Sequence, residues 1–261
     1  MLLTSTKDLP SFPQKIISLV PSQTELLAYL GLQNEVIGIT KFCVHPADWL
    51  KTKIKIGGTK NVNIPKVQQL KPDLIIGNKE ENVKEQIITL AEEFPVWVTD
   101  VNNLEDAFVM INNIGELANK INRVHALIAD IRNEFSKLRV EAYPIKACYL
   151  IWRNPYMTIG GDTFINDMMK HCQLQNIFED KCRYPEITLK EIKDRNCQLV
   201  LLSSEPYPFK ENHIKEIQAY LPGVKIVLVN GEMFSWYGSR LLLAPGYFNN
   251  LSNHFHCSVM S

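Results

Sequence analysis

The sequence lacks the signatures of several protein classes. It has no apolar run long enough to span a membrane and no CxxC pair among its six cysteines. Basic and acidic residues are equal in number, 28 of each, so no net charge draws the chain to nucleic acid. The GxSxG, HExxH, GxGxxG and Walker motifs are also missing. These absences argue against a membrane protein, a nucleic-acid-binding protein and the enzymes that such motifs mark.

The first fifteen residues lack the apolar core of a secretion signal, because their only apolar run, at Leu2-Leu3, is followed by Lys7 and Asp8. The cysteines are scattered in apolar surroundings, which is typical of reduced thiols rather than of a disulfide framework. They are Cys43, Cys148, Cys172, Cys182, Cys197 and Cys257. Both observations predict a cytoplasmic protein. A periplasmic location follows instead if a signal has been removed.

One pattern of apolar segments occurs twice along the chain. In each half a strand leads through a loop into a helix, and a second and a third strand follow. The strands are expected at 16–20, 74–76 and 96–98, and again at 148–152, 199–202 and 226–229. Alternating strands and helices predict parallel sheets, and two similar lobes predict a ligand cleft between them, at the carboxyl ends of the strands.

Residues 121–138 carry apolar side chains at helical spacing, and no proline interrupts them. We therefore predict an N-terminal lobe over 1–118, a bridging helix within 119–142 and a C-terminal lobe over 143–261. A single rigid helix between the lobes predicts little movement on ligand binding. From Asn249 onward no pattern is visible, so we expect a loosely attached tail.

The first helix has conventional end signals. Ser22 and Glu25 have the spacing of a capping box, and Gly31 is placed to end the helix. The same helix start, with Ser22 and Gln23, would offer free N–H groups to a ligand in the cleft. Capping and ligand binding can coexist at this position.

Aromatic and charged side chains follow several strands, where they would line the cleft mouth and suit a large, flat ligand. They are Phe42, Cys43, His45, Arg153, Tyr156, Phe234, Trp236, Tyr237 and Arg240. Arg240 opens the final helix, where the helix dipole disfavours a cation. Its partner is therefore either a ligand or an anion such as Glu232 or Asp162, and Arg153 poses the same choice.

Metal ligation has two weak candidate sets, Cys43 with His45, and His254 with His256 and Cys257. Neither set supplies three ligands at a familiar spacing, so we expect no metal site. Gly57-Gly58-Thr59-Lys60 resembles a phosphate loop but lacks its spacing, and an ordinary turn is the alternative.

The order of motifs resembles the helical-backbone (class III) substrate-binding proteins that deliver cobalamin, haem or iron-siderophore to ABC transporters, and most of all their cobalamin-binding branch. The matching segments are 16–26 (IISLVPSQTEL), 36–39 (VIGI), 70–77 (LKPDLIIG), 158–161 (TIGG), 176–178 (NIF) and 199–202 (LVLL). The resemblance implies an α/β fold of two Rossmann-like lobes joined by one long helix, with the ligand in the cleft between them. It implies a cobalamin, haem or ferric chelate ligand, and no intrinsic cofactor.

The ligand-contacting positions of that family fall here on Ser22, Phe42, Thr59, Asn78, Tyr184, Glu232 and Trp236. Phe42, Tyr184 and Glu232 keep the residue type of the cobalamin receptors. Thr59 and Asn78 stand where those receptors often have tryptophan, and Trp236 stands where they have arginine. The cleft is thus expected to keep its place but to have a different lining.

Family members that dock on an ABC permease use one glutamate on each lobe, and here Pro65 and Lys190 occupy those places, with Glu191 adjacent. We therefore expect a monomeric, non-enzymatic binding protein, acting with a permease or as an intracellular relative. Two alternatives stay open. One is an enzyme that uses Glu232, Arg240, Arg153 and His45, and the other is an interaction module with a vestigial cleft.

Overall fold

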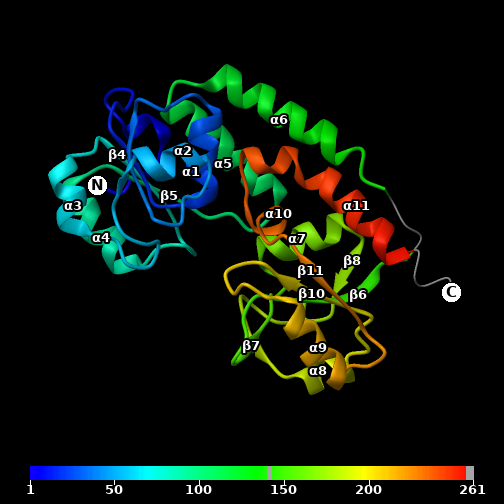
Figure 1. Ribbon diagram of the computed structural model, residues 1–261. Helices are drawn as coiled ribbons and strands as arrows, with labels where there is room; N and C mark the ends of the chain where they lie inside the picture. Colours follow the sequence, from blue (N-terminus) through cyan, green and yellow to red (C-terminus); the bar gives the residue numbers. More distant parts are fainter. Residues whose placement is uncertain (140–142, 257–261) are drawn as a thin grey trace. The chain divides into compact units, whose positions relative to one another are not determined.

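The computed structural model describes residues 1–139 and 143–256, and the side chains up to residue 253 (Figure 1). The chain divides into two compact units. The first unit comprises Met1–Val101, Glu105–Arg132 and Trp236–Leu241, and the second comprises Asn102–Leu104, Asn133–Ser235 and Leu242–Ser261. Residues Trp236–Leu241, which the sequence pattern assigns to the C-terminal lobe, therefore cluster with the first unit.

The first unit is built on a parallel five-stranded sheet in the order β3-β2-β1-β4-β5. Its strands are β1 (Ile16–Ser18), β2 (Val36–Ile39), β3 (Ile54–Lys55), β4 (Leu74–Asn78) and β5 (Val96–Thr99). The helices along this part of the chain are η1 (Thr6–Asp8), α1 (Pro21–Tyr29), α2 (Ala47–Thr52), α3 (Ile64–Leu70), α4 (Lys84–Glu93), α5 (Leu104–Leu117) and α6 (Ile121–Phe135). Its core joins Ile17 and Ile75 of the sheet to Val67 of α3 and Leu90 of α4.

The second unit has a parallel four-stranded sheet in the order β11-β10-β6-β8, and β7 pairs with β9 in an antiparallel pair. Its strands are β6 (Ile145–Leu150), β7 (Tyr156–Met157), β8 (Leu174–Asn176), β9 (Glu186–Ile187), β10 (Leu199–Ser203) and β11 (Lys225–Val229). The remaining helices are α7 (Phe164–His171), α8 (Leu189–Asp194), α9 (Glu211–Tyr220), α10 (Glu232–Ser235), η2 (Ser239–Leu242) and α11 (Ala244–His256).

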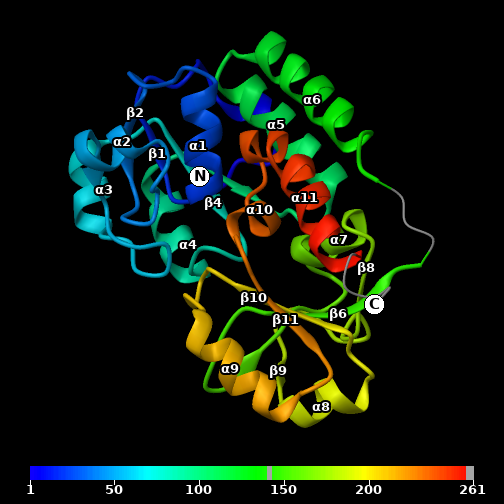
Figure 2. The same cartoon turned by 45° about the vertical axis from the view of Figure 1, so that its right-hand side comes forward.

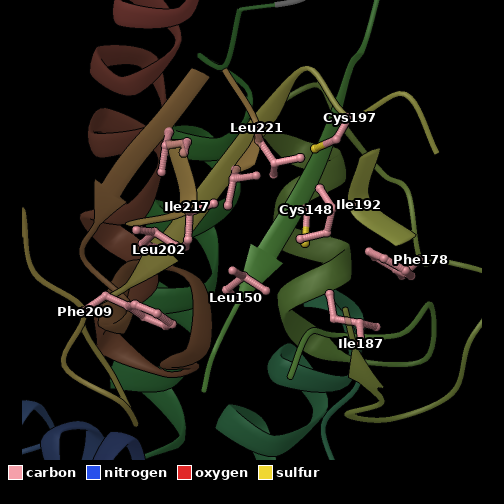
Figure 3. Close-up of a cluster of buried hydrophobic side chains, with 12 residues drawn as sticks. Cys148, Leu150, Phe178, Ile187, Ile192, Cys197, Leu202, Phe209, Ile217 and Leu221 are labelled. Carbon is pink, nitrogen blue, oxygen red and sulfur yellow. The ribbon is translucent and has the colours of Figure 1, made fainter. Parts of the chain in front are cut away.

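The second sheet is covered on both faces, by α7 on one side and by α8 and α9 on the other (Figures 1 and 2). Cys148, Leu150, Val200 and Leu202 alternate along β6 and β10, so they point to one face, where they meet a cluster from α8 and α9 (Figure 3). A strand buried on both faces reads as a continuous apolar run, which explains why these strands were visible in the sequence.

The helix predicted over 121–138 is present as α6 but ends at Phe135, with Val124, Leu127 and Ile131 buried along one face. The predicted tail from Asn249 onward is wrong for residues 249–256, where α11 continues, and residues 257–261 lie outside the described part of the chain. Ala244, Phe248 and Leu251 are buried at helical spacing, a pattern that the many polar residues between them hide. In the parts of the chain that the structure describes, no helix has the length and apolarity needed to cross a membrane.

The predicted capping box at Ser22 is also wrong. Pro21 occupies the first position of α1, Val20 precedes the helix, and no side chain caps it. Proline suits that position because its missing N–H would have no partner within the helix. Gly31 does follow the helix with φ +75°, as the sequence predicts, and only glycine adopts that conformation without strain.

Five cysteines lie in the described chain as free thiols, and only Cys182 is exposed. Burial raises the pKa values of the Cys43, Cys148 and Cys172 thiols and that of Cys197 to about 11. Because the thiolate is the reactive form, we expect a thiol reagent at neutral pH to label Cys182 first among these five. Peptide mapping after brief labelling of the folded protein measures this. Equal labelling of Cys148 and Cys182 would contradict the burial of the second unit's core.

Candidate functional site

The carboxyl edge of the first sheet gathers most of the predicted ligand residues. Ser22 and Gln23 lie in the first turn of α1 after β1, Phe42 follows β2, Thr59 follows β3, and Asn78 ends β4. Because all the strands are parallel, the loops that follow them meet along one edge. The structure therefore brings these five residues to one side of the first unit.

A buried polar network holds the loops of this edge in place. Gln23 Nε2 donates to Thr99 Oγ1 at 2.5 Å, and Asn78 Nδ2 donates to the backbone oxygen and Oγ1 of Thr99, both at 3.1 Å. Asn78 Oδ1 accepts the backbone N–H of Glu80 at 2.8 Å. Gln23 and Asn78 are almost completely buried, as are Ser22 and Thr59. Hydrogen bonds within the protein thus fix Gln23 and Asn78, and they stabilise the edge.

Phe42 differs from these residues because its side chain is 51% exposed. Its ring lies beside Gly58, where an added Cβ would come within 3.2 Å of Phe42 Cε2. Lys41 Nζ lies 5.1 Å from the ring centroid. Phe42 therefore offers a supported apolar surface beside a positive charge, an arrangement that suits a flat ligand with an acidic edge.

The segment Trp236–Leu241 packs within the first unit. Trp236 is buried, its ring meets that of His45 edge to face at 5.4 Å, and the Arg240 guanidinium lies 5.2 Å from its centroid. Arg240 donates two hydrogen bonds to Glu25, from Nε at 3.0 Å and from Nη2 at 2.6 Å. Glu25 of α1 is therefore an anion that pairs with Arg240, a partner that the sequence pattern did not suggest.

Cys43 and His45, the weak metal candidates, each have other neighbours in the structure. Thr24 and Thr40 place their hydroxyls 3.1 and 3.2 Å from Cys43 Sγ, and His45 packs on Trp236. Among the residues whose side chains are described, no group of three potential metal ligands comes together. The structure does not describe the side chains of the other candidate set, His254, His256 and Cys257.

In the second unit Arg153 and Tyr156 converge on Glu216 of α9. Arg153 donates to Glu216 from Nε at 3.2 Å and from Nη2 at 2.7 Å, and the Tyr156 hydroxyl donates at 3.0 Å. The hydrogen bonds from Arg153 lower the pKa of the Glu216 carboxyl, which is therefore charged at neutral pH. The positive charge of Arg153 is thus balanced within the protein.

Tyr184 and Glu232 also lie in the second unit, and both are partly buried. Glu232 begins α10, and its N–H donates to Asn230 Oδ1 at 3.0 Å. Tyr184 belongs to a segment that bonds to the loop at 158–161, where Gly160 N–H donates to the Arg183 oxygen at 2.7 Å and Thr158 N–H to the Pro185 oxygen at 3.1 Å. The position of Tyr184 therefore depends on that glycine loop.

Two features of the second unit were not predicted from the sequence. Trp152, counted there as the end of a strand, lies beyond β6 with 40% of its surface exposed. A polar pocket of about 370 Å³ also opens at the start of α7 and contains none of the predicted site residues. It is lined by Asn102, Asn103, Gly161, Asp162, Thr163, Asn166, Asp167, Lys170 and Arg183. The loop between β5 and α5 forms one wall of the pocket. No local sequence pattern indicates that this loop lies beside the start of α7.

The positions compared with permease-docking acids lie on two helices. Pro65 lies in the first turn of α3, and Lys190 on α8 pairs with Asp194 at 2.6 Å. Glu191 accepts hydrogen bonds from the backbone N–H and hydroxyl of Thr188 at 2.8 and 2.9 Å, which lower its pKa. Its carboxylate therefore caps α8.

Comparisons with known proteins agree with this architecture. The vitamin B12-binding protein of Pectobacterium carotovorum subsp. carotovorum is 23% identical over 244 residues, which cover 90% of this chain and 86% of that protein. The periplasmic vitamin B12-binding protein BtuF of Vibrio cholerae is structurally similar, with a TM-score of 0.76 and 19% identity over 94% of this chain and 98% of that one. The periplasmic haem-binding protein RhuT of Roseiflexus sp. RS-1 gives a TM-score of 0.79 and 17% identity, over 94% and 98% of the two chains.

These similarities confirm the predicted α/β fold and the predicted resemblance. The family model described as periplasmic binding protein matches residues 16–222, which is most of the chain. The alternative of a small-molecule enzyme is therefore wrong. The chain belongs to the periplasmic binding protein family, whose members bind solutes without transforming them.

Proposed function

We propose that the protein binds a metal-centred macrocycle or chelate, namely a corrinoid, a haem-like ring or a ferric siderophore. The observation that carries this proposal is the ring of Phe42, half exposed and supported by Gly58, at the carboxyl edge of the first sheet. Relatives named as vitamin B12-binding and haem-binding proteins support the same ligand class. The ligand is cargo, and the fold needs no cofactor of its own.

The roles of the predicted site residues differ under this proposal. Phe42 stacks on the ligand, and Lys41 beside it pairs with an acidic group on the ligand edge. Gln23 and Asn78 act indirectly, because their hydrogen bonds to Thr99 fix the loops on either side. In the second unit, Tyr156, Tyr184, Arg153 and Glu232 remain the proposed ligand residues. We do not favour cobalamin over the other two ligand classes, because Thr59, Asn78 and Trp236 differ from the residues that the cobalamin receptors have at these positions.

Family analogy would place the protein in the periplasm with an ABC permease. Pro65 and Lys190 remove the acids of the usual docking contact, and the carboxylate of the neighbouring Glu191 is engaged by Thr188. Without those acids the charge pairing that orients the two proteins is lost. We therefore propose a protein that holds its ligand without that docking contact.

Titration of the purified protein with hydroxocobalamin and, separately, with haemin tests the proposed function. A saturable change in the visible spectrum at one ligand per chain is expected with at least one of them, or with a ferric hydroxamate. Protein that binds none of the three would be an interaction module with a vestigial site, and the proposal would be wrong.

Replacing Phe42 with alanine is expected to weaken binding about ten- to a hundredfold, because a stacking ring is lost. Phe12 provides a matched control, since its side chain is 53% exposed but lies before β1, at the opposite edge of the sheet. Phe12→Ala should bind with unchanged affinity. Equal losses in the two variants would show that Phe42 does not touch the ligand.

A further inference from the structure

The exposed aromatic side chains of the described chain fall into two groups. One group lies at the amino edge of a sheet and the other at the carboxyl edge. They are Phe12, Tyr29, Phe42, Tyr143, Trp152 and Tyr220. Phe12 and Tyr143 precede the first strands of the two sheets, and Tyr29 and Tyr220 end helices that lead into the next strand, so these four lie at amino edges. Only Phe42 and Trp152 follow a strand. Each unit thus has one exposed ring at its carboxyl edge, where parallel sheets bind their ligands.

Trp152 is also the one exposed side chain among the four tryptophans of the sequence. Its backbone is held by the Met157 N–H, which donates to the Trp152 oxygen at 3.2 Å. The next residue, Arg153, is fixed by its two hydrogen bonds to Glu216. The ring is therefore exposed on a short, well-anchored stretch of chain.

Trp152 belongs to a cluster of rings with Tyr207, Phe209 and His213, and we name these four residues the aromatic shelf. Trp152 meets Tyr207 at 5.6 Å and 69°, and Tyr207 meets Phe209 at 4.8 Å. Phe209 belongs to the buried core of the second unit (Figure 3). The exposed ring is thus connected through one tyrosine to the hydrophobic core.

His213 anchors the shelf from α9. Its Nδ1 accepts the Lys210 N–H at 2.8 Å, so Nδ1 carries no proton and Nε2 carries it in the neutral ring. Nε2 lies 3.3 Å from the Tyr207 hydroxyl and can donate to it. Tyr207 is held further by its own N–H, which donates to the Ile151 oxygen at 3.3 Å. The shelf is therefore pre-organised by both ring contacts and hydrogen bonds.

From these observations we infer that Trp152 is the ligand-stacking residue of the second unit and selects planar macrocycles over non-planar chelates. Trp236, which the sequence suggests for this role, is buried against His45 and Arg240. A rigid indole gains most from a flat, extended π-system and least from a globular ferric hydroxamate. This inference rests on the proposed function and assigns a residue and a shape preference within it.

The test compares wild-type protein with Trp152→Ala, Trp152→Phe and Tyr220→Ala in titrations with haemin, hydroxocobalamin and a ferric hydroxamate. For whichever macrocycle the wild type binds, Trp152→Ala should lose about ten- to a hundredfold in affinity. Trp152→Phe should retain most of the affinity, and Tyr220→Ala, which removes an exposed ring at the amino edge, should change nothing. Quenching of tryptophan fluorescence by the ligand should be smaller in Trp152→Phe than in the wild type.

The failures of the two proposals are distinguishable. Wild-type protein that binds no probe overturns the proposed function and this inference together. If the wild type binds and Trp152→Ala binds equally well, the inference alone is overturned. The same holds if Trp152→Ala loses as much affinity for the ferric hydroxamate as for the macrocycles. Thermal melting of each variant shows whether a loss comes from unfolding. If Trp152→Ala does not fold, unequal quenching between the wild type and Trp152→Phe still decides the question.

Discussion

Replacement of Glu25 by alanine is expected to lower the free energy of unfolding by about 3 kcal/mol. The change removes the carboxylate that accepts two hydrogen bonds from Arg240, whose side chain is only 9% exposed. A guanidinium at such a depth cannot recover that loss fully from water. Because the Glu25 side chain is 22% exposed, the estimate lies at the lower end for a buried pair. Chemical denaturation of the variant and the wild type measures the difference.

Glu105→Ala is the matched control, because it breaks an ion pair of the same residue types at the surface. Arg132 Nη2 lies 2.9 Å from Glu105 Oε2, and the two side chains are 55% and 69% exposed. This change should cost less than about 1 kcal/mol, since water screens an exposed pair. Equal losses for Glu25→Ala and Glu105→Ala would mean that the Glu25–Arg240 pair does not hold Trp236–Leu241 in place.

Replacement of Gly160 by alanine is expected to cost about 2 to 3 kcal/mol. A Cβ at this position would come 2.4 Å from the Lys181 oxygen and 2.8 Å from the carbonyl carbon of Cys182. Both obstacles are backbone atoms, so the segment at 181–185 must shift. That segment carries Tyr184, and ligand affinity should therefore fall with stability. Denaturation and a ligand titration on the same preparation measure both effects.

Gly246→Ala should have the opposite effect on stability. Gly246 lies in α11, and a Cβ added there would meet no neighbouring atom within 4 Å. Alanine restricts the unfolded chain and favours the helix, so the gain should be about 0.5 to 1 kcal/mol. If Gly160→Ala and Gly246→Ala both lowered the free energy of unfolding, the close contacts around Gly160 would not explain the effect of Gly160→Ala.

Local patterns predicted much of the fold. Val124, Leu127 and Ile131 recur at helical spacing and are the buried face of α6. The apolar runs at 74–76 and 199–202 are central strands buried on both sides, which sequence periodicity detects well. The resemblance to known receptors rested on these same segments, and it predicted the fold correctly for that reason.

Contacts between distant residues could not be predicted in this way. Glu25 has the spacing of a capping residue, yet its carboxylate pairs with Arg240, 215 positions away. Val20 is the residue before α1 and Pro21 takes the first helical position, so Ser22 lies two positions too late to cap the helix. Only the tertiary structure determines which of several locally reasonable roles a side chain performs.

Exposure was equally hidden in the sequence. Trp152 lies two residues beyond β6 and Trp236 directly follows α10, and both are large aromatic residues in a segment that follows a strand. The structure buries Trp236 and leaves Trp152 partly open, because Trp236 has His45 and Arg240 beside it. The sequence could thus name the edge at which a ligand ring is expected, but not the side chain that is exposed there.

The return of Trp236–Leu241 to the first unit has a consequence for biosynthesis. A ribosome releases the chain from its amino end, so β1 to β5 emerge long before Arg240 has been translated. Until then Glu25 lacks that partner, and His45 is not covered by Trp236. The nascent first unit would therefore remain incomplete through most of translation, and a truncation before residue 236 would damage the amino-terminal unit as well as the carboxyl-terminal one.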